Sequence, residues 1–122
     1  MEIKIDARQT DSVVRALAAL AQEHRLAAFR LLVQAGDGGL AAGMLAGRLG
    51  VPASSLSFHL AHLTQAGLIS QRRAGRSLIY SADYAAMGAL MAFLTENCCG
   101  GVAICAPAAA CPTNEIDERN VA

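Results

Sequence analysis

Four cysteines near the C-terminal end are the residues best suited to specific chemistry in this 122-residue chain. Cys98 and Cys99 are adjacent, and Cys105 and Cys111 follow. Thiolate sulfur is a soft ligand that selects soft, thiophilic ions. A zinc ribbon would need C-x-x-C pairs, and the sequence has none. The spacing therefore favours a small thiol site, although neighbouring exposed cysteines can also form a disulfide on oxidation.

A second pattern indicates a helix from about Ala53 to Gln65. Leu56, Leu60 and Leu63 stand at i, i+4 and i+7, so they are predicted to face a core. The opposite side has almost no Lys or Glu, unlike an ordinary solvated helix. Small hydroxyl side chains lie at its N-terminal end, as close approach to DNA requires.

Three arginines follow in a predicted β-hairpin. Residues 68–73 and 77–82 are typical of two short strands around Ala74-Gly75. Arg72, Arg73 and Arg76 gather near the tip without an intervening acidic residue, which favours contact with phosphate. The alternative is an ordinary charged hairpin tip.

The remaining pattern predicts the helices that position these groups. A first helix begins at the caps Thr10 and Asp11, a second follows Gln22 and stops at the glycines of 36–39, and a third covers 40–49. A fifth helix should run from Asp83 to about Asn97 and is apolar on nearly all sides. Such a helix needs two partners, its own core and a second copy of the chain, so we expect a homodimer. Residues 1–97 then form one domain, and residues 98–122 an effector-binding segment with a flexible tail.

Composition sets limits on the class of protein. The net charge is zero, but residues 1–94 hold nine Lys or Arg against six Asp or Glu, and residues 95–122 hold one against four. The predicted domain is therefore basic and the tail acidic. No secretory signal is present and the apolar run 87–94 is too short to span a bilayer, so a cytoplasmic protein with reduced thiols is expected. No phosphate-binding glycine loop, nucleotide fingerprint or catalytic carboxylate pair indicates an enzyme.

Taken in order, these segments resemble the ArsR/SmtB family of metal-responsive repressors. The resemblance covers about residues 10–97 and rests on Leu56-Ser-Phe-His-Leu-Ala-His-Leu63, Ala66-Gly-Leu-Ile69, Arg72-Arg-Ala-Gly-Arg76 and Ile79-Tyr80. It implies a mainly α-helical, homodimeric winged helix-turn-helix with a β-hairpin wing. It also implies binding to an inverted repeat in double-stranded operator DNA, and release when an inducer binds.

The resemblance implies which side chains reach the DNA. They are Ser54, Ser55, Ser57, Phe58, His59, His62, Arg72, Arg73 and Arg76. The serines could instead only cap and solvate the helix start. A hydrogen-bonded structural role for His59 remains open, and His62 could be merely solvated.

The inducer implied by the resemblance is trivalent arsenic. The third predicted helix has no cysteine pair, and the last helix has no histidine, so two inducer sites known in the family are missing. What remains is similar to an arsenic-responsive subgroup with a vicinal cysteine pair and a third cysteine after the last helix. Cys98, Cys99 and Cys105 are the implied ligands of arsenite or antimonite. Cys111 is interpreted as a spare thiol, with a fourth ligand for cadmium or zinc, or an accessory sulfur for capture, as the alternatives. Alternatives are a cadmium- or lead-sensing or a thiol-redox-sensing repressor, and less favoured are a thiol-based arsenical-reducing enzyme and a metal-binding protein.

Overall fold

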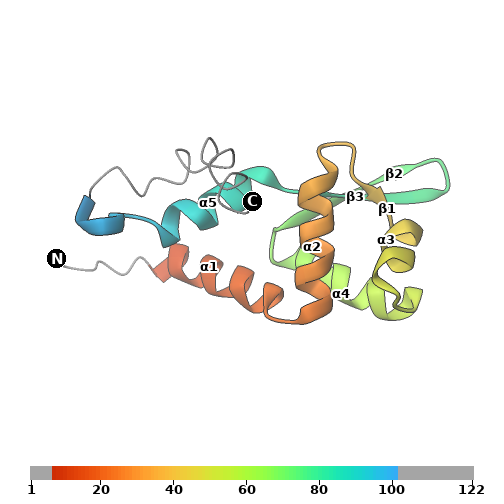
Figure 1. Ribbon diagram of the computed structural model, residues 1–122, viewed down its shortest axis with the longest axis horizontal. Helices are drawn as coiled ribbons and strands as arrows, with labels where there is room; N and C mark the ends of the chain where they lie inside the picture. Colours follow the sequence, from red (N-terminus) through yellow and green to blue (C-terminus); the bar gives the residue numbers. More distant parts are fainter. Residues whose placement is uncertain (1–6, 102–122) are drawn as a thin grey trace, which may run out of the picture.

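The computed structural model describes residues 7–101, which form five α-helices, a small sheet and a short 3-10 turn. The helices are α1 (Ala7–Leu20), α2 (Glu23–Ala35), α3 (Ala42–Leu49), α4 (Ala53–Gln65) and α5 (Tyr84–Leu94). The strands are β1 (Leu40–Ala41), β2 (Ile69–Ala74) and β3 (Ser77–Ala82), and η1 (Cys98–Gly101) comes last. Figure 1 shows α1 and α5 at one end, the sheet and α3 at the other, and α2 and α4 between them. No helix within residues 7–101 has the length and apolarity to cross a membrane.

The α4 prediction is confirmed at both ends. Leu56, Leu60 and Leu63 are at most 1% exposed and anchor the helix in a single core. The chain leaves the helix at Gly67, whose φ of 80° is easily adopted only without a Cβ. Burial of this leucine face determines which side chains of α4 point outward.

The predicted hairpin is confirmed, with the strands shifted slightly. β2 pairs antiparallel with β3 from Ile69–Ala82 to Ala74–Ser77, so the turn holds Gly75 and Arg76. A third strand that the sequence did not predict lies on the other side of β3. Leu40 pairs with Tyr80, giving the sheet order β1-β3-β2. The predicted helix over 40–49 was therefore wrong in its first two residues, because pairing with β3 holds them extended.

Gly39 makes this third strand possible. Its φ is 73°, and a Cβ at this position would overlap the carbonyl oxygen of Tyr80 in β3. The backbone thus approaches β3 closely only because residue 39 has no side chain.

Two helix ends differ from the prediction. α1 already includes Ala7, the first described residue, so Thr10 and Asp11 lie inside the helix and do not cap it. At the other end α5 stops at Leu94 and does not continue to Asn97. The backbone leaves the helix at the C-cap Thr95, and the φ of 57° at Asn97 prevents the right-handed helix from resuming. The predicted N-cap of α5 is confirmed, since the Asp83 carboxylate accepts a hydrogen bond from the backbone N–H of Ala86 at 3.0 Å.

Candidate nucleic-acid interface and thiol pair

The outer face of α4 is exposed and carries few charges. Ser54, Ser55 and Ser57 are exposed at its N-terminal end. The N-cap position is Pro52, which supplies no capping side chain, so none of these serines is the N-cap. Their hydroxyl groups are therefore available to a surface that approaches the helix.

An exposed aromatic residue continues this face. Phe58 is 62% exposed, an unusual state for a large apolar side chain. The His62 ring lies one turn further along, edge to face with Phe58, with the ring centroids 4.6 Å apart. Edge-to-face contact stabilises such pairs. The two rings thus form a partly apolar surface on the outside of α4.

His59 lies at the edge of this face, against α2. Its ring centroid is 5.7 Å from that of His24, and its Nδ1 atom is buried without a hydrogen bond in the part of the chain that the structure describes. Burial lowers the pKa of His59 below its ordinary value of 6.5, and positive charge on Arg25, His24 and His62 lowers it further. The hydrogen bond that a structural role would require is absent at Nδ1, and the surroundings disfavour the protonated form of His59.

This environment makes a pH dependence expected. Unfolded His59 takes up a proton below about pH 6.5, whereas the folded protein resists that proton. The free energy of unfolding should therefore fall as pH is lowered from 7.5 to 5.5, and His59→Gln should lose less over the same interval. Urea unfolding at both pH values measures the difference. Equal losses for the two proteins would mean that His59 is not the responsible group.

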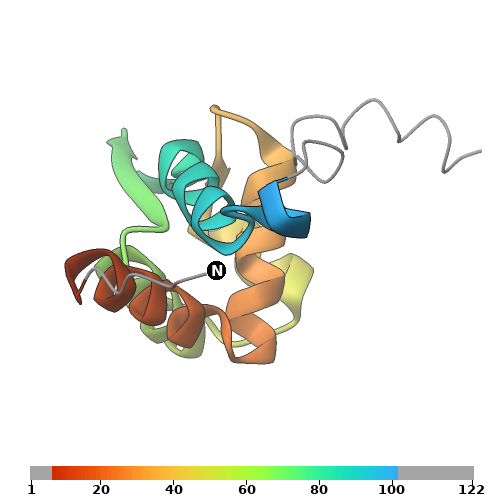
Figure 2. The same ribbon diagram turned by 90° about the vertical axis from the view of Figure 1, so that its left-hand side faces the viewer.

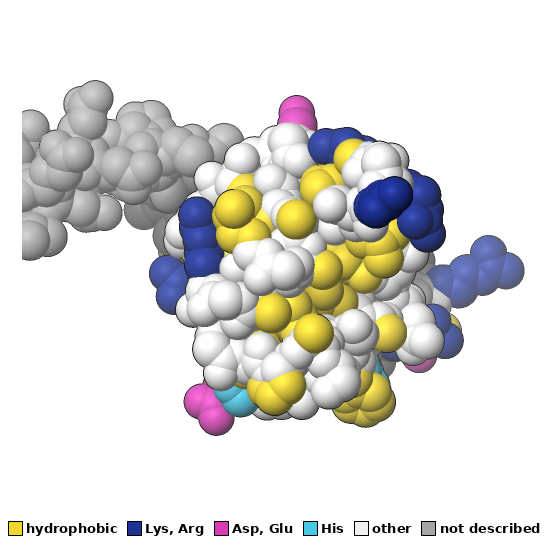
Figure 3. Space-filling view, turned by 90° about the vertical axis from the view of Figure 1, so that its right-hand side faces the viewer, with side chains coloured by type: hydrophobic (Ala, Val, Ile, Leu, Met, Phe, Trp, Pro, Cys, Tyr) yellow, Lys and Arg dark blue, Asp and Glu magenta, His cyan; other side chains and the backbone are white. Residues whose placement is uncertain are grey.

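The three wing arginines have different surroundings. Arg72 donates from Nη2 to the backbone carbonyl of Gly38 at 3.0 Å, which ties the wing to the loop before β1. Arg73 and Arg76 are exposed. Figure 3, which views the molecule from the wing end, shows apolar side chains across the middle of this face and Lys and Arg side chains at its edges. The exposed Arg73 and Arg76 suit contact with a polyanion.

The adjacent cysteines lie just beyond α5. Cys98 is half-buried, Cys99 is exposed, and their sulfur atoms are 3.7 Å apart. Cys99 has a φ of 56°, so the chain reverses direction at the pair. Cys105 and Cys111 lie outside the described residues. Among residues 7–101, no three His, Cys, Asp or Glu side chains are arranged to hold a metal ion.

An apolar surface remains at the end opposite the wing. Figure 2 looks onto this end, where α1 and α5 lie side by side. α1 buries Val13, Ala16 and Ala19, and α5 buries Leu90. Four large apolar side chains on these two helices remain 42–54% exposed: Val14, Leu17, Met91 and Leu94. This is the surface that the apolar pattern of α5 predicted for a second copy.

Comparisons with known proteins agree with this geometry. Residues 20–72 match a family model described as a helix-turn-helix domain. An ArsR-like transcriptional regulator from Rhodococcus sp. RHA1 is 27% identical over 72% of this chain and 80% of its own, with a TM-score of 0.64. The homodimeric winged helix-turn-helix DNA-binding domain of a possible ArsR-family regulator from Mycobacterium bovis is 30% identical over 80% of this chain and 92% of its own, with a TM-score of 0.60. A possible transcriptional regulator for arsenical resistance is 30% identical over 65% of this chain and 79% of its own, with a TM-score of 0.58. A search of curated proteins gave no match.

Proposed function

Since the chain belongs to the ArsR family of DNA-binding transcriptional regulators, we propose that it is a homodimeric repressor released from its operator by trivalent arsenic. The observation that carries the arsenic part is the pair of sulfurs 3.7 Å apart directly after α5. When both residues are reduced, two soft ligands this close suit a thiophilic ion that binds several thiolates. Cys105 would supply the third sulfur. The similarity to a possible transcriptional regulator for arsenical resistance supports the proposal.

The position of the pair suggests how binding could change DNA affinity. Together with α1, α5 forms the surface expected to join two copies of the chain. η1 follows the end of α5 after only three residues. A ligand that orders the chain after Leu94 acts at the end of this surface, so it can change the angle between the two DNA-binding heads. A 100-fold loss of DNA affinity requires a coupling free energy of about 2.7 kcal/mol, within the usual range for allosteric proteins.

The test needs a DNA probe, which wild-type protein can select from a random-sequence duplex library under reductant. Fluorescence anisotropy then follows binding of the selected duplex while arsenite is added. We expect arsenite to weaken wild-type binding about 100-fold, with the same response in Cys111→Ser. Cys98→Ser, Cys99→Ser and Cys105→Ser should bind DNA normally and lose the response.

Other outcomes separate the alternatives. DNA binding that arsenite leaves unchanged in reduced wild type refutes arsenic sensing. Release by cadmium or lead would then indicate a different thiophilic inducer, and release by an oxidant a redox sensor of the same fold. Failure to enrich any duplex would contradict sequence-specific DNA binding itself.

A further inference from the structure

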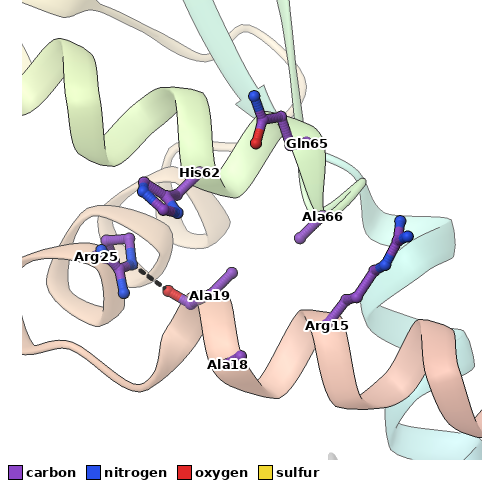
Figure 4. Close-up of a pocket in the computed structure, with 7 residues that line it drawn as sticks. All are labelled: Arg15, Ala18, Ala19, Arg25, His62, Gln65 and Ala66. Carbon is purple, nitrogen blue, oxygen red and sulfur yellow. Dashed lines mark hydrogen bonds between the residues drawn. The ribbon is translucent and has the colours of Figure 1, made fainter.

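A basic groove lies beside the outer face of α4, and of its lining residues only His62 has been assigned to DNA so far. Its volume is about 630 Å³, and it lies where the turn between α1 and α2 meets the C-terminal half of α4. Figure 4 shows its lining. The polar lining residues are Arg15 from α1, Arg25 from α2, and His62 and Gln65 from α4. None of the lining residues is acidic.

Arg25 is held in place at the inner side of this groove. Its Nε donates to the backbone carbonyl of Ala19 at 2.7 Å, and its backbone N–H donates to the Gln22 side chain at 2.9 Å. Within residues 7–101 the only ion pair joins Arg15 to Asp11, so no carboxylate neutralises Arg25. The Nε bond leaves the terminal guanidinium nitrogens for another acceptor. A fixed guanidinium of this kind is suited to a phosphate.

The groove is continuous with the surface expected to face DNA. His62 lines the groove on one side and contacts Phe58 on the outer face of α4 on the other. An α-helix with its side chains is about 10–12 Å across, close to the width of about 12 Å of the DNA major groove. A helix seated in that groove therefore has a phosphate backbone along each side. The protein elements beside the helix are therefore the ones that contact this phosphate backbone.

From this arrangement we infer that Arg25, assisted by Arg15 at the exposed rim, binds a backbone phosphate of operator DNA next to α4. This inference rests on the proposed DNA-binding function and extends its interface to the α1–α2 corner. The Arg15 side chain is 70% exposed, so the groove does not enclose a ligand. A phosphate on the surface of DNA therefore fits this groove better than a small anion that must be surrounded by protein. Gln65 can add a hydrogen bond to the same strand. Contact with phosphate contributes affinity and orientation but no reading of the base sequence.

The experiment compares Arg25→Gln with Arg30→Gln, using the duplex selected by wild type and a range of salt concentrations. Arg30 is an exposed arginine of the same helix but lies on a different groove, between α2 and α3, so it is a control of equal charge. Each phosphate contact contributes about 0.9 to the slope of log affinity against log salt. We expect Arg25→Gln to weaken binding about tenfold at moderate salt and to lower the slope by about 2 for a dimer, equally for selected and unrelated duplexes. Arg30→Gln should change binding less than about twofold.

Two further variants keep the test decisive. Arg25→Lys retains the charge and should keep most of the salt slope. Arg15→Gln should lower the slope by less than Arg25→Gln. If Arg25→Gln and Arg30→Gln have the same melting temperature and the same salt slope, the inference is wrong. DNA binding by α4 and the wing is not contradicted by that result. If Arg25→Gln weakens binding only to the selected duplex, Arg25 acts on base recognition and the phosphate assignment is wrong.

Discussion

Replacing Gly39 with alanine is expected to destabilise the fold by about 2–4 kcal/mol, although the change adds one methyl group. The positive φ disfavours any L residue with a Cβ, and the new methyl would overlap the Tyr80 carbonyl. Relief of the overlap requires β1 to move away from β3 and lose its pairing. Urea unfolding monitored by circular dichroism measures the loss.

Gly38 provides the matched control. No atom lies within 4 Å of a Cβ built on it, and its φ is outside the left-handed region. Gly38→Ala should leave stability unchanged or raise it by about 0.4–1 kcal/mol, because alanine restricts the unfolded chain. Equal destabilisation by the two substitutions would show that the close approach to Tyr80 is not the cause.

The second large effect is expected at the apolar end. Met91→Glu places a charge on the exposed side of α5, where a partner copy would bury it. We expect the dissociation constant of the dimer to rise at least about 100-fold, measured by sedimentation equilibrium. Affinity for an inverted repeat should fall with it, since two linked heads bind far more tightly than one.

Leu26→Glu is the control for this surface. Leu26 is also a large exposed apolar side chain, at 45%, but it belongs to α2. Its replacement should leave the dimer intact. A wild-type protein that sediments as a monomer at micromolar concentration, or equal dissociation by both variants, would contradict dimerisation through α1 and α5.

Local signals in the sequence explain what could be predicted. The leucine spacing of α4, the cap at Asp83 and the glycine turn of the wing each act within one element, so their patterns were sufficient. β1 could not be predicted, because two residues of strand have no periodicity and form only against β3, forty residues later. The end of α5 was missed for a related reason. No glycine or proline lies between Leu94 and Gly100 to mark the end, yet the backbone leaves the helix at Thr95 and is left-handed at Asn97.

The candidate DNA-binding surface was predictable only where a single element carries it. The outer face of α4 follows from helical periodicity, and its serines and Phe58 are exposed as predicted. The groove with Arg25 is made by three helices, and nothing in the sequence around Arg25 places it beside His62. Likewise, the tie between Arg72 and Gly38 joins residues far apart in the chain. Tertiary packing creates both features.

The cysteine pair is attached to the domain without being part of its core. Within residues 7–101, the buried residues that hold the helices and sheet together lie between Val13 and Leu90, before η1 begins. Substitutions at Cys98 and Cys99 are therefore expected to leave the packing that orients α4 intact. If the proposed function holds, inducer chemistry and DNA recognition can for this reason diverge independently during evolution. The same separation makes the domain a suitable starting point for building biosensors, in which new ligand-binding segments are joined to an unchanged DNA-binding head.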